Sequence, residues 1–205
     1  MIEIGPALVA YSRVAPGRRE TMGETPWLSG PERERARRWG PGPRADRFVE
    51  GRRLLRELML RLAPGVDPAV EARCGRCGRT DHGPVRATHA PVVLSLSYSE
   101  PFVVAAGATL DCTAALGIDL ERGDPDAVLQ ELAPLFSPAD PPTLRRWTAI
   151  EAATKADGRG LRLPPDRIRI AGDRAQLPGS DASFRLLDAG APAGFTATLA
   201  LVDAG

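Results

Sequence analysis

Lysine is nearly absent from this 205-residue sequence: Lys155 is the single lysine among 27 basic residues, and all the others are arginine. Long apolar runs are also absent, so no segment predicts a membrane span. The start, "MIEIGPALVAYSRV", lacks the basic residues, apolar core and small-residue cleavage site of a signal peptide, so we expect none. The three cysteines are an odd number without secretory context, which predicts reduced thiols and a cytoplasmic protein.

A strong charge of either sign is missing as well. The formal net charge is +1, which argues against a protein that coats nucleic acid. Hydrophobic residues make up 43% of the chain and charged residues 26%, as in ordinary globular proteins. The 21 glycines and 20 prolines predict many loops but not disorder. The length suits one domain or two small lobes.

Apolar spacing, caps and turn residues predict an α+β fold. Ser29 and Glu32 form a capping-box pattern at the start of the first predicted helix. Helices are predicted over 28–39, 41–65, 127–136 and 142–160, and strands over 2–13, on both sides of a turn at 99–101, over 114–122, and in three tail segments. Helices precede strands in both halves. This order suggests two similar α+β lobes that meet at the midpoint of the chain, over 1–108 and 109–205.

Three carboxylates and the single lysine follow the periods of a strand and a helix. Asp119 and Glu121 are two apart on a strand and leave the same face. Glu151 and Lys155 are four apart on a helix and share one flank. Such residues suit Mg²⁺ beside a phosphate. Alternatively, the helix pair is a surface salt bridge worth about 0.3–0.5 kcal/mol and the strand carboxylates form a solvated face. Spacing alone does not show that strand and helix converge.

The chain resembles a known family in these same segments. "LGIDLE" (116–121) and "RRWTAIEAATKADGRGL" (145–161) are similar to the paired signature of the 4'-phosphopantetheinyl transferases, G-[IV]-D-x-E and W-x-x-K/x-E-[AS]-x-x-K-x-x-G-x-G. "LSGPERERARRW", "DRFVEGRRLLRELM", "CGRCGRTDHGPV" and "LSLSYSEPFVVAA" resemble further family segments in the same order. The resemblance covers nearly the whole chain. It is closest to the monomeric, surfactin-synthetase-activating type, which implies a pseudo-dimer of two α+β lobes with the active site between them.

The resemblance implies a reaction and the residues that perform it. Family members transfer the phosphopantetheine arm of coenzyme A to a serine of an apo acyl or peptidyl carrier protein and release 3',5'-ADP. Asp119, Glu121 and Glu151 would then hold Mg²⁺, with Mn²⁺ as an alternative. Glu151 is the expected general base, and Lys155 would contact phosphate. We expect a monomer with no nucleic-acid or membrane partner.

Coenzyme A contacts are likewise implied by the resemblance, mostly in the N-terminal lobe. Arg52 matches the family position that contacts the 3'-phosphate, and Arg53 and Arg35 are weaker candidates. Most of the neighbouring arginines are expected to form a solvated helix face. The complete set assigned to coenzyme A is Arg35, Arg52, Arg53, His82, Ser97, Tyr98, Asp119 and Lys155.

Two departures from the family pattern concern coenzyme A. Tyr98 stands where the family turn S-H-S has histidine, and "HGPVR" lacks the lysine of H-G-K-P. A tyrosine offers a hydrogen bond but no positive charge at neutral pH. We therefore expect weaker coenzyme A binding or a shifted pose, with turnover retained. A coenzyme A-binding relative that has lost turnover is the alternative.

The segment from Cys74 to His89 contains two cysteines and both histidines. Cys74 and Cys77 form a C-x₂-C half-site, but the intervals to His82 and His89 are not those of a zinc finger. A zinc site, and with it a small zinc or nucleic-acid binding module, is one alternative. The resemblance instead implies a loop bordering the adenine of coenzyme A.

Overall fold

The computed structural model describes residues 1–14, 25, 27–80, 82–123, 125–138 and 141–204. Helices and strands each account for about a third of the residues, and the strands form several sheets, which confirms the α+β prediction. The helices are α1 (Gly30–Trp39), α2 (Pro43–Leu62), α3 (Pro125–Leu132) and α4 (Leu144–Asp157), with 3₁₀ turns at Ala133–Leu135, Gly160–Arg162 and Pro165–Arg167.

The described strands form two larger sheets and a hairpin, all antiparallel. The N-terminal sheet has the order β1 (Ile2–Ile4), β2 (Ala7–Arg13), β6 (Phe102–Thr109), β5 (Val92–Ser99). The C-terminal sheet has the order β7 (Thr113–Arg122), β11 (Phe195–Asp203), β10 (Ser183–Asp188), β9 (Arg174–Gln176), β8 (Arg169–Ala171). The hairpin pairs β3 (Val70–Ala72) with β4 (Val85–Ala87).

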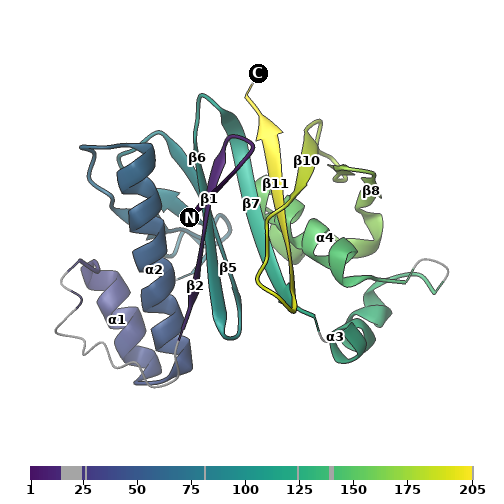
Figure 1. Ribbon diagram of the computed structural model, residues 1–205, viewed down its shortest axis with the longest axis horizontal. Helices are drawn as coiled ribbons and strands as arrows, with labels where there is room; N and C mark the ends of the chain where they lie inside the picture. The colour runs from purple at the N-terminus through teal and green to yellow at the C-terminus, as the bar shows by residue number, and fades with distance from the viewer. Residues whose placement is uncertain (15–24, 26, 81, 124, 139–140, 205) are drawn as a thin grey trace.

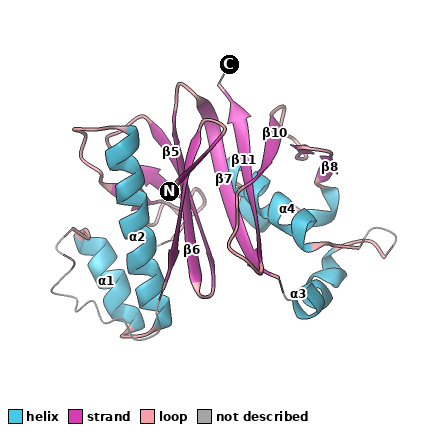
Figure 2. Ribbon diagram, in the orientation of Figure 1, coloured by secondary structure: helices cyan, strands magenta, loops and turns pink. Residues whose placement is uncertain are grey.

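Each larger sheet is covered by a helix on its outer side, as Figures 1 and 2 show. The apolar stripe of α2, which includes Leu55, Leu58 and Met59, packs on the outer face of the N-terminal sheet. On the C-terminal sheet, Ile150 and Ala153 of α4 lie in the equivalent outer core. The capping box of α1 is confirmed, because the side chains of Ser29 and Glu32 each bond the other's backbone amide.

The inner faces of the two sheets pack against each other. Val9 and Val104 from the N-terminal sheet share one core with Ile118 and Leu199 from the C-terminal sheet. This packing follows from strand alternation: Leu116, Ile118 and Leu120 point inward, as the sequence predicted, so their neighbours point toward α4. At the sheet edges, β5 lies beside β7.

Gly117 sets the distance between β7 and α4. A Cβ atom at this position would lie 2.0 Å from the backbone oxygen of Ala152 and 2.6 Å from the nitrogen of Ala156. Only a glycine permits the helix to approach the strand so closely. The glycine of "LGIDLE" therefore brings α4 onto the strand that carries Asp119.

The single strand predicted over 2–13 is two antiparallel strands, β1 and β2. Three further strands were not predicted from the sequence. Strands β3, β4 and β9 span three residues each, too short for alternation to be read. Among the described helices, none combines the length and apolar character needed to cross a membrane.

Candidate active site

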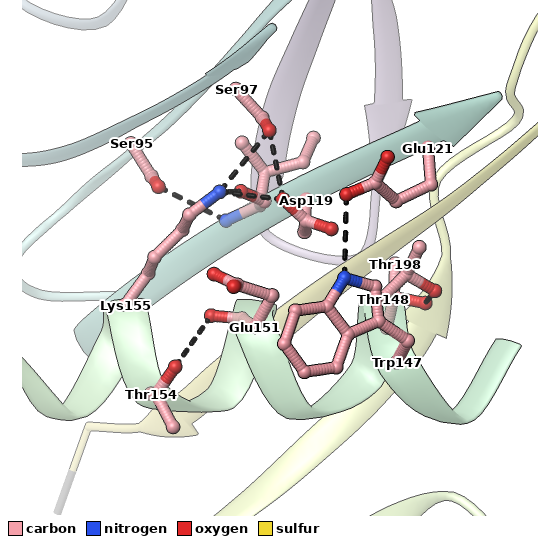
Figure 3. Close-up of polar contacts among 11 residues, drawn as sticks. Ser95, Ser97, Asp119, Glu121, Trp147, Thr148, Glu151, Thr154, Lys155 and Thr198 are labelled. Carbon is pink, nitrogen blue, oxygen red and sulfur yellow. Dashed lines mark hydrogen bonds and ion pairs between the residues drawn. The ribbon is translucent and has the colours of Figure 1, made fainter. Parts of the chain in front are cut away.

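The predicted carboxylates and lysine come together between β7 and α4. Asp119 and Glu121 extend from β7 toward the helix, while Glu151 and Lys155 extend from α4 toward the strand, as Figure 3 shows. We call Asp119, Glu121 and Glu151 the carboxylate cluster. Strand and helix spacing predicted each pair separately, and the close contact at Gly117 joins the two pairs.

Lys155 forms hydrogen bonds at the side of the carboxylate cluster that is next to β5 of the N-terminal sheet. Its Nζ donates hydrogen bonds to Asp119 Oδ1 at 2.6 Å, to Ser97 Oγ at 3.1 Å and to the backbone oxygen of Ile118 at 3.1 Å. The ion pair of Lys155 is therefore with Asp119 across the strand–helix interface. The alternative of an exposed Glu151–Lys155 surface pair does not describe this arrangement.

Asp119 is a buried carboxylate that is only partly satisfied by the described residues. The residue is 3% exposed, and Ser97 Oγ also donates to its Oδ1, at 2.8 Å. Its Oδ2 is buried and has no hydrogen-bond partner in the described part of the chain. Leaving a buried acceptor unpaired costs about 1–3 kcal/mol, so a ligand for this oxygen would stabilise the site.

The other two carboxylates are destabilised as anions by their surroundings. Burial raises the pKa of Glu151 to about 7; Lys155 opposes this increase, and Asp119 and Glu121 add to it. Burial, followed by the charge of Asp119, also raises the pKa of Glu121. The indole Nε1 of Trp147 donates to Glu121 Oε1 at 3.3 Å and positions it. Like charges held together in this way fit a site that takes up a cation.

A cavity of about 320 Å³ opens next to Lys155. We call it the arginine cavity, because Arg35 and Arg52 line it together with Lys155, while no aspartate or glutamate among the described residues does so. Phe48, Leu94 and Leu96 supply an apolar wall. Three cations without a lining carboxylate favour an anionic ligand, and the apolar wall suits a ligand that also has a flat or aliphatic part.

Arg52 and Arg35 are held in place by aromatic and acidic neighbours. Arg52 is 3% exposed; its Nε lies 2.9 Å from Glu32 Oε1 and its guanidinium stacks 4.8 Å from the Phe48 ring centre. Arg35 stacks on the same ring at 4.9 Å. Burial lowers the pKa of Arg52, while Tyr98 and Glu32 act against that decrease. A buried guanidinium beside a second arginine is a strong attractor for a phosphate group.

Tyr98 also lines the arginine cavity, as its sequence position suggested. A Cβ added to Gly51 of α2 would lie 2.7 Å from the Tyr98 hydroxyl oxygen, so this glycine makes room for the phenol. The residue is 41% exposed, yet its hydroxyl end is enclosed, and burial there raises the pKa of the phenol. Tyr98 thus offers a neutral hydroxyl to the cavity.

Four residues assigned to coenzyme A lie outside the described lining of this cavity, one of them Asp119 of the carboxylate cluster. Arg53 points along α2 and forms ion pairs with Glu50 and Glu57. His82 lies 3.4 Å from the sulfur of Cys77. Ser97 contacts Asp119 and Lys155, so it orients the charged groups.

Sequence reasoning missed other positioning residues. Ser95 Oγ accepts a hydrogen bond from the backbone nitrogen of Ile118 at 3.0 Å, so β5 holds β7 just before Asp119. Strand alternation could have found it, because Ser95 shares a face with Ser97. Thr148 and Thr198 hydrogen-bond at 2.8 Å beneath the cluster, a contact that no sequence pattern indicates.

The chain matches no protein-family model and no curated protein in the comparisons made. Its function is therefore inferred from its residues and their arrangement.

Proposed function

We propose that this protein transfers the 4'-phosphopantetheine group of coenzyme A to a serine of an apo acyl or peptidyl carrier protein, with Mg²⁺, as a holo-carrier-protein synthase. The observation that carries the proposal is the meeting of Asp119, Glu121, Glu151 and Lys155 beside a cavity lined by arginines. The resemblance to the phosphopantetheinyl transferases supplies the reaction, and the geometry supports it.

The carboxylate cluster fits a hard divalent cation. Asp119 Oδ2 is a buried acceptor without a described partner, and burial, with a further contribution from the neighbouring carboxylates, raises the pKa values of Glu121 and Glu151. Oxygen ligands from a few carboxylates, completed by water and phosphate, are what Mg²⁺ prefers. When bound there, Mg²⁺ or Mn²⁺ would neutralise the charge of the pyrophosphate.

Coenzyme A would place its nucleotide phosphates in the arginine cavity. The buried Arg52 and the half-buried Arg35 provide positive charge for the 3'-phosphate, and Lys155 lies on the side of the cavity nearest the carboxylate cluster. The apolar wall at Phe48 and the Gly83–Val85 segment would pack against the adenine. The pyrophosphate would then lie between the two groups of charges.

The residues of the chain would divide the chemistry between them. The attacking serine hydroxyl needs a proton acceptor, and the Glu151 carboxylate, which extends from α4 toward β7 beside Lys155, is placed for that task directly or through water. Lys155 would donate hydrogen bonds to the departing phosphate oxygens as negative charge develops there. To do so, its ammonium would exchange part of its contact with Asp119 for phosphate.

The proposed architecture is a pseudo-dimer of two lobes, 1–108 and 109–205, acting as a monomer. Its support is that each larger sheet is built within one of these segments, except that β6 extends one residue past 108, and that each carries its own outer helix. The proposed site lies where the lobes meet: β5, the N-terminal edge strand, lies beside β7, which carries Asp119 and Glu121.

Intact mass spectrometry of apo carrier proteins tests the proposal. The protein is incubated with coenzyme A, Mg²⁺ and several apo carriers; we expect a phosphopantetheine-sized mass increase on the carrier serine, lost with EDTA. The Asp119→Asn variant should lose the activity, whereas Asp203→Asn, an exposed aspartate paired with Arg185, should keep it. Absence of modification of every carrier tried would refute the transferase proposal.

A coenzyme A-binding protein without turnover is the second candidate, favoured by two observations. Tyr98 supplies no charge to the cavity, and Lys155 is already bound to Asp119. Coenzyme A binding in calorimetry, without modification of any carrier, would support this second candidate over the first.

A further inference from the structure

Residues 73–80 and 82–84, which we call the cysteine loop, gather metal-ligating side chains far from the carboxylate cluster in sequence. The ligand atoms of Cys74, Cys77 and His82 all lie within 4.8 Å of one another, and Cys77 Sγ is 3.4 Å from His82 Nε2. His89 is separate: its Nε2 lies 4.0 Å from a carboxylate oxygen of Asp67. Of the four residues that the sequence offered, three therefore converge.

The backbone of the cysteine loop holds these three side chains in place. The nitrogen of Cys74 donates to the oxygen of Arg79 at 2.9 Å, and the nitrogen of Gly78 donates back to the oxygen of Cys74 at 2.9 Å. Gly78 has a φ of 69°, which lets the chain turn directly after Cys77. The loop therefore does not need a metal to bring its ligands together.

Gly83 closes the loop at its other end. A Cβ at Gly83 would lie 2.5 Å from the carbonyl carbon and oxygen of Arg73, so only glycine allows the two strands of the loop to touch. The Arg73 nitrogen donates to the oxygen of Pro84 at 3.1 Å. His82, immediately before this contact, is thereby directed to the same end of the hairpin as the two cysteines.

We propose that Cys74, Cys77 and His82 bind one Zn²⁺ ion, with the fourth coordination position taken by water or another donor. Two thiolates and an imidazole are a typical zinc donor set. Zinc bonds of about 2.0–2.3 Å in tetrahedral geometry place ligand atoms about 3.5–3.8 Å apart, close to the spacing of Cys77 and His82. Soft sulfur ligands make Mg²⁺ unsuitable for this site.

Zinc binding by the cysteine loop would affect the wall of the arginine cavity. Gly83, Pro84 and Val85, which follow His82 directly, form part of its wall. A metal fixed to His82 would hold that wall in one position and so favour coenzyme A binding. Only this consequence rests on the proposed transferase function; zinc binding itself does not.

Cobalt substitution tests the site without coenzyme A or carrier protein. The full chain is purified with a non-thiol reductant and titrated with Co²⁺, which reports thiolate ligands by near-ultraviolet charge transfer and tetrahedral geometry by visible bands. We expect one Co²⁺ per chain, displaced by Zn²⁺. Cys77→Ser should lose the thiolate bands, and His82→Ala should weaken Co²⁺ binding at least about tenfold.

Matched controls come from the same chain. Cys112 is an exposed free cysteine outside this group, and His89 faces Asp67, so Cys112→Ser and His89→Ala should bind Co²⁺ as the unchanged protein does. The proposal is overturned if the unchanged protein shows no thiolate bands at stoichiometric Co²⁺, or if Cys112→Ser removes them as Cys77→Ser does. Circular dichroism of each variant separates a lost ligand from a lost fold.

Carrier modification, measured separately, keeps the two proposals distinguishable. A protein that binds Co²⁺ through Cys77 but modifies no carrier supports the zinc site and refutes the transferase. A protein that modifies carriers while giving no thiolate bands refutes the zinc site alone.

Discussion

The carboxylate cluster and the cysteine loop both gather groups that bind cations, but their ligands meet at different distances. Among the described residues, only Cys74, Cys77 and His82 bring three metal-ligating atoms within 4.8 Å of one another. In the carboxylate cluster the acids are farther apart, and Lys155 pairs with Asp119. The loop is assembled by turns in a few neighbouring residues, whereas the cluster is assembled by β7 packing against α4.

The difference fits the chemistry of the two proposed ions, Zn²⁺ and Mg²⁺. A zinc site built from protein ligands takes most or all of its four donors from the chain, so those donors lie close together around the ion. Mg²⁺ keeps several waters and takes phosphate oxygens, so its carboxylates need not converge without a substrate. Lys155 meanwhile partly balances the buried charge of Asp119. The following changes are expected to affect the two regions unequally.

Lys155→Arg should produce the largest effect. The compact ammonium reaches Ser97, Asp119 and the oxygen of Ile118 at once, and a planar guanidinium does not fit the same three acceptors. We expect kcat/KM for carrier modification to fall about 10²–10³-fold, as when one donor to a developing charge is removed. Activity within a few-fold of the unchanged protein would mean that Lys155 only balances charge. Co²⁺ binding by the cysteine loop should not change.

Arg52 and Arg53, which are adjacent in α2, serve as the test and the control for ligand binding in the arginine cavity. Arg52 lines the cavity, whereas Arg53 pairs with Glu50 and Glu57. Loss of a charged hydrogen bond to phosphate should make Arg52→Ala bind coenzyme A about 10–100-fold more weakly and lose its preference over dephospho-coenzyme A. Arg53→Ala should bind within about twofold of the unchanged protein. Equal effects in calorimetry would contradict this placement.

Gly117→Ala tests the contact that assembles the carboxylate cluster. Its Cβ would meet the Ala152 oxygen at 2.0 Å, so α4 must move away from β7. Overpacking of this kind costs about 1–3 kcal/mol of unfolding free energy, measurable in urea. Gly30→Ala is the control, because no atom lies within 4 Å of its added Cβ. If Gly117→Ala is as stable and active as Gly30→Ala, the close contact does not set the site.

Tyr98→His introduces the residue usual in the family that the sequence resembles and should have a smaller effect. An imidazole that is partly protonated adds positive charge to the cavity, so the KM for coenzyme A should fall by about 3–10-fold, and more at pH 6.5 than at pH 8. An unchanged or higher KM at both pH values would show that the tyrosine does not limit coenzyme A binding.

Glu151→Gln should change stability with pH in the metal-free protein. The pKa of Glu151 is raised from its ordinary value of 4.5 to about 7 in the folded protein. Its contribution to the free energy of unfolding is therefore fully present below pH 4.5 and is lost as the pH rises through 7. The glutamine cannot ionise, so the variant and the unchanged protein should melt alike near pH 4. By pH 8 the variant should be more stable, and even about 1 kcal/mol would raise Tm by about 2–4 °C.

This difference in Tm should shrink when Mg²⁺ is added, because the ion stabilises the ionised glutamate but has less affinity for the amide. A difference that does not depend on pH would place the effect of the substitution in packing instead of charge.

The sequence predicted elements better than the contacts between them. The alternation of apolar residues around Ile118 was sufficient to predict β7, and the capping box was sufficient to predict the start of α1. Both signals depend only on residues that are close in sequence. The pairing of Lys155 with Asp119 could not be predicted, because it depends on the approach of α4 at Gly117. The convergence of His82 with the cysteines depends on Gly83, whose close contact with Arg73 leaves no periodic signal.

Coupling between Mg²⁺ and coenzyme A is the most direct test of a site shared by metal and pyrophosphate. Coenzyme A is titrated into the protein by calorimetry with Mg²⁺ and again with EDTA, and the same pair of titrations is repeated with Asp119→Asn. We expect Mg²⁺ to tighten coenzyme A binding at least about tenfold in the unchanged protein, a coupling of about 1.4 kcal/mol, and to have little effect in the variant. Equal affinity with Mg²⁺ and with EDTA in the unchanged protein would contradict the account.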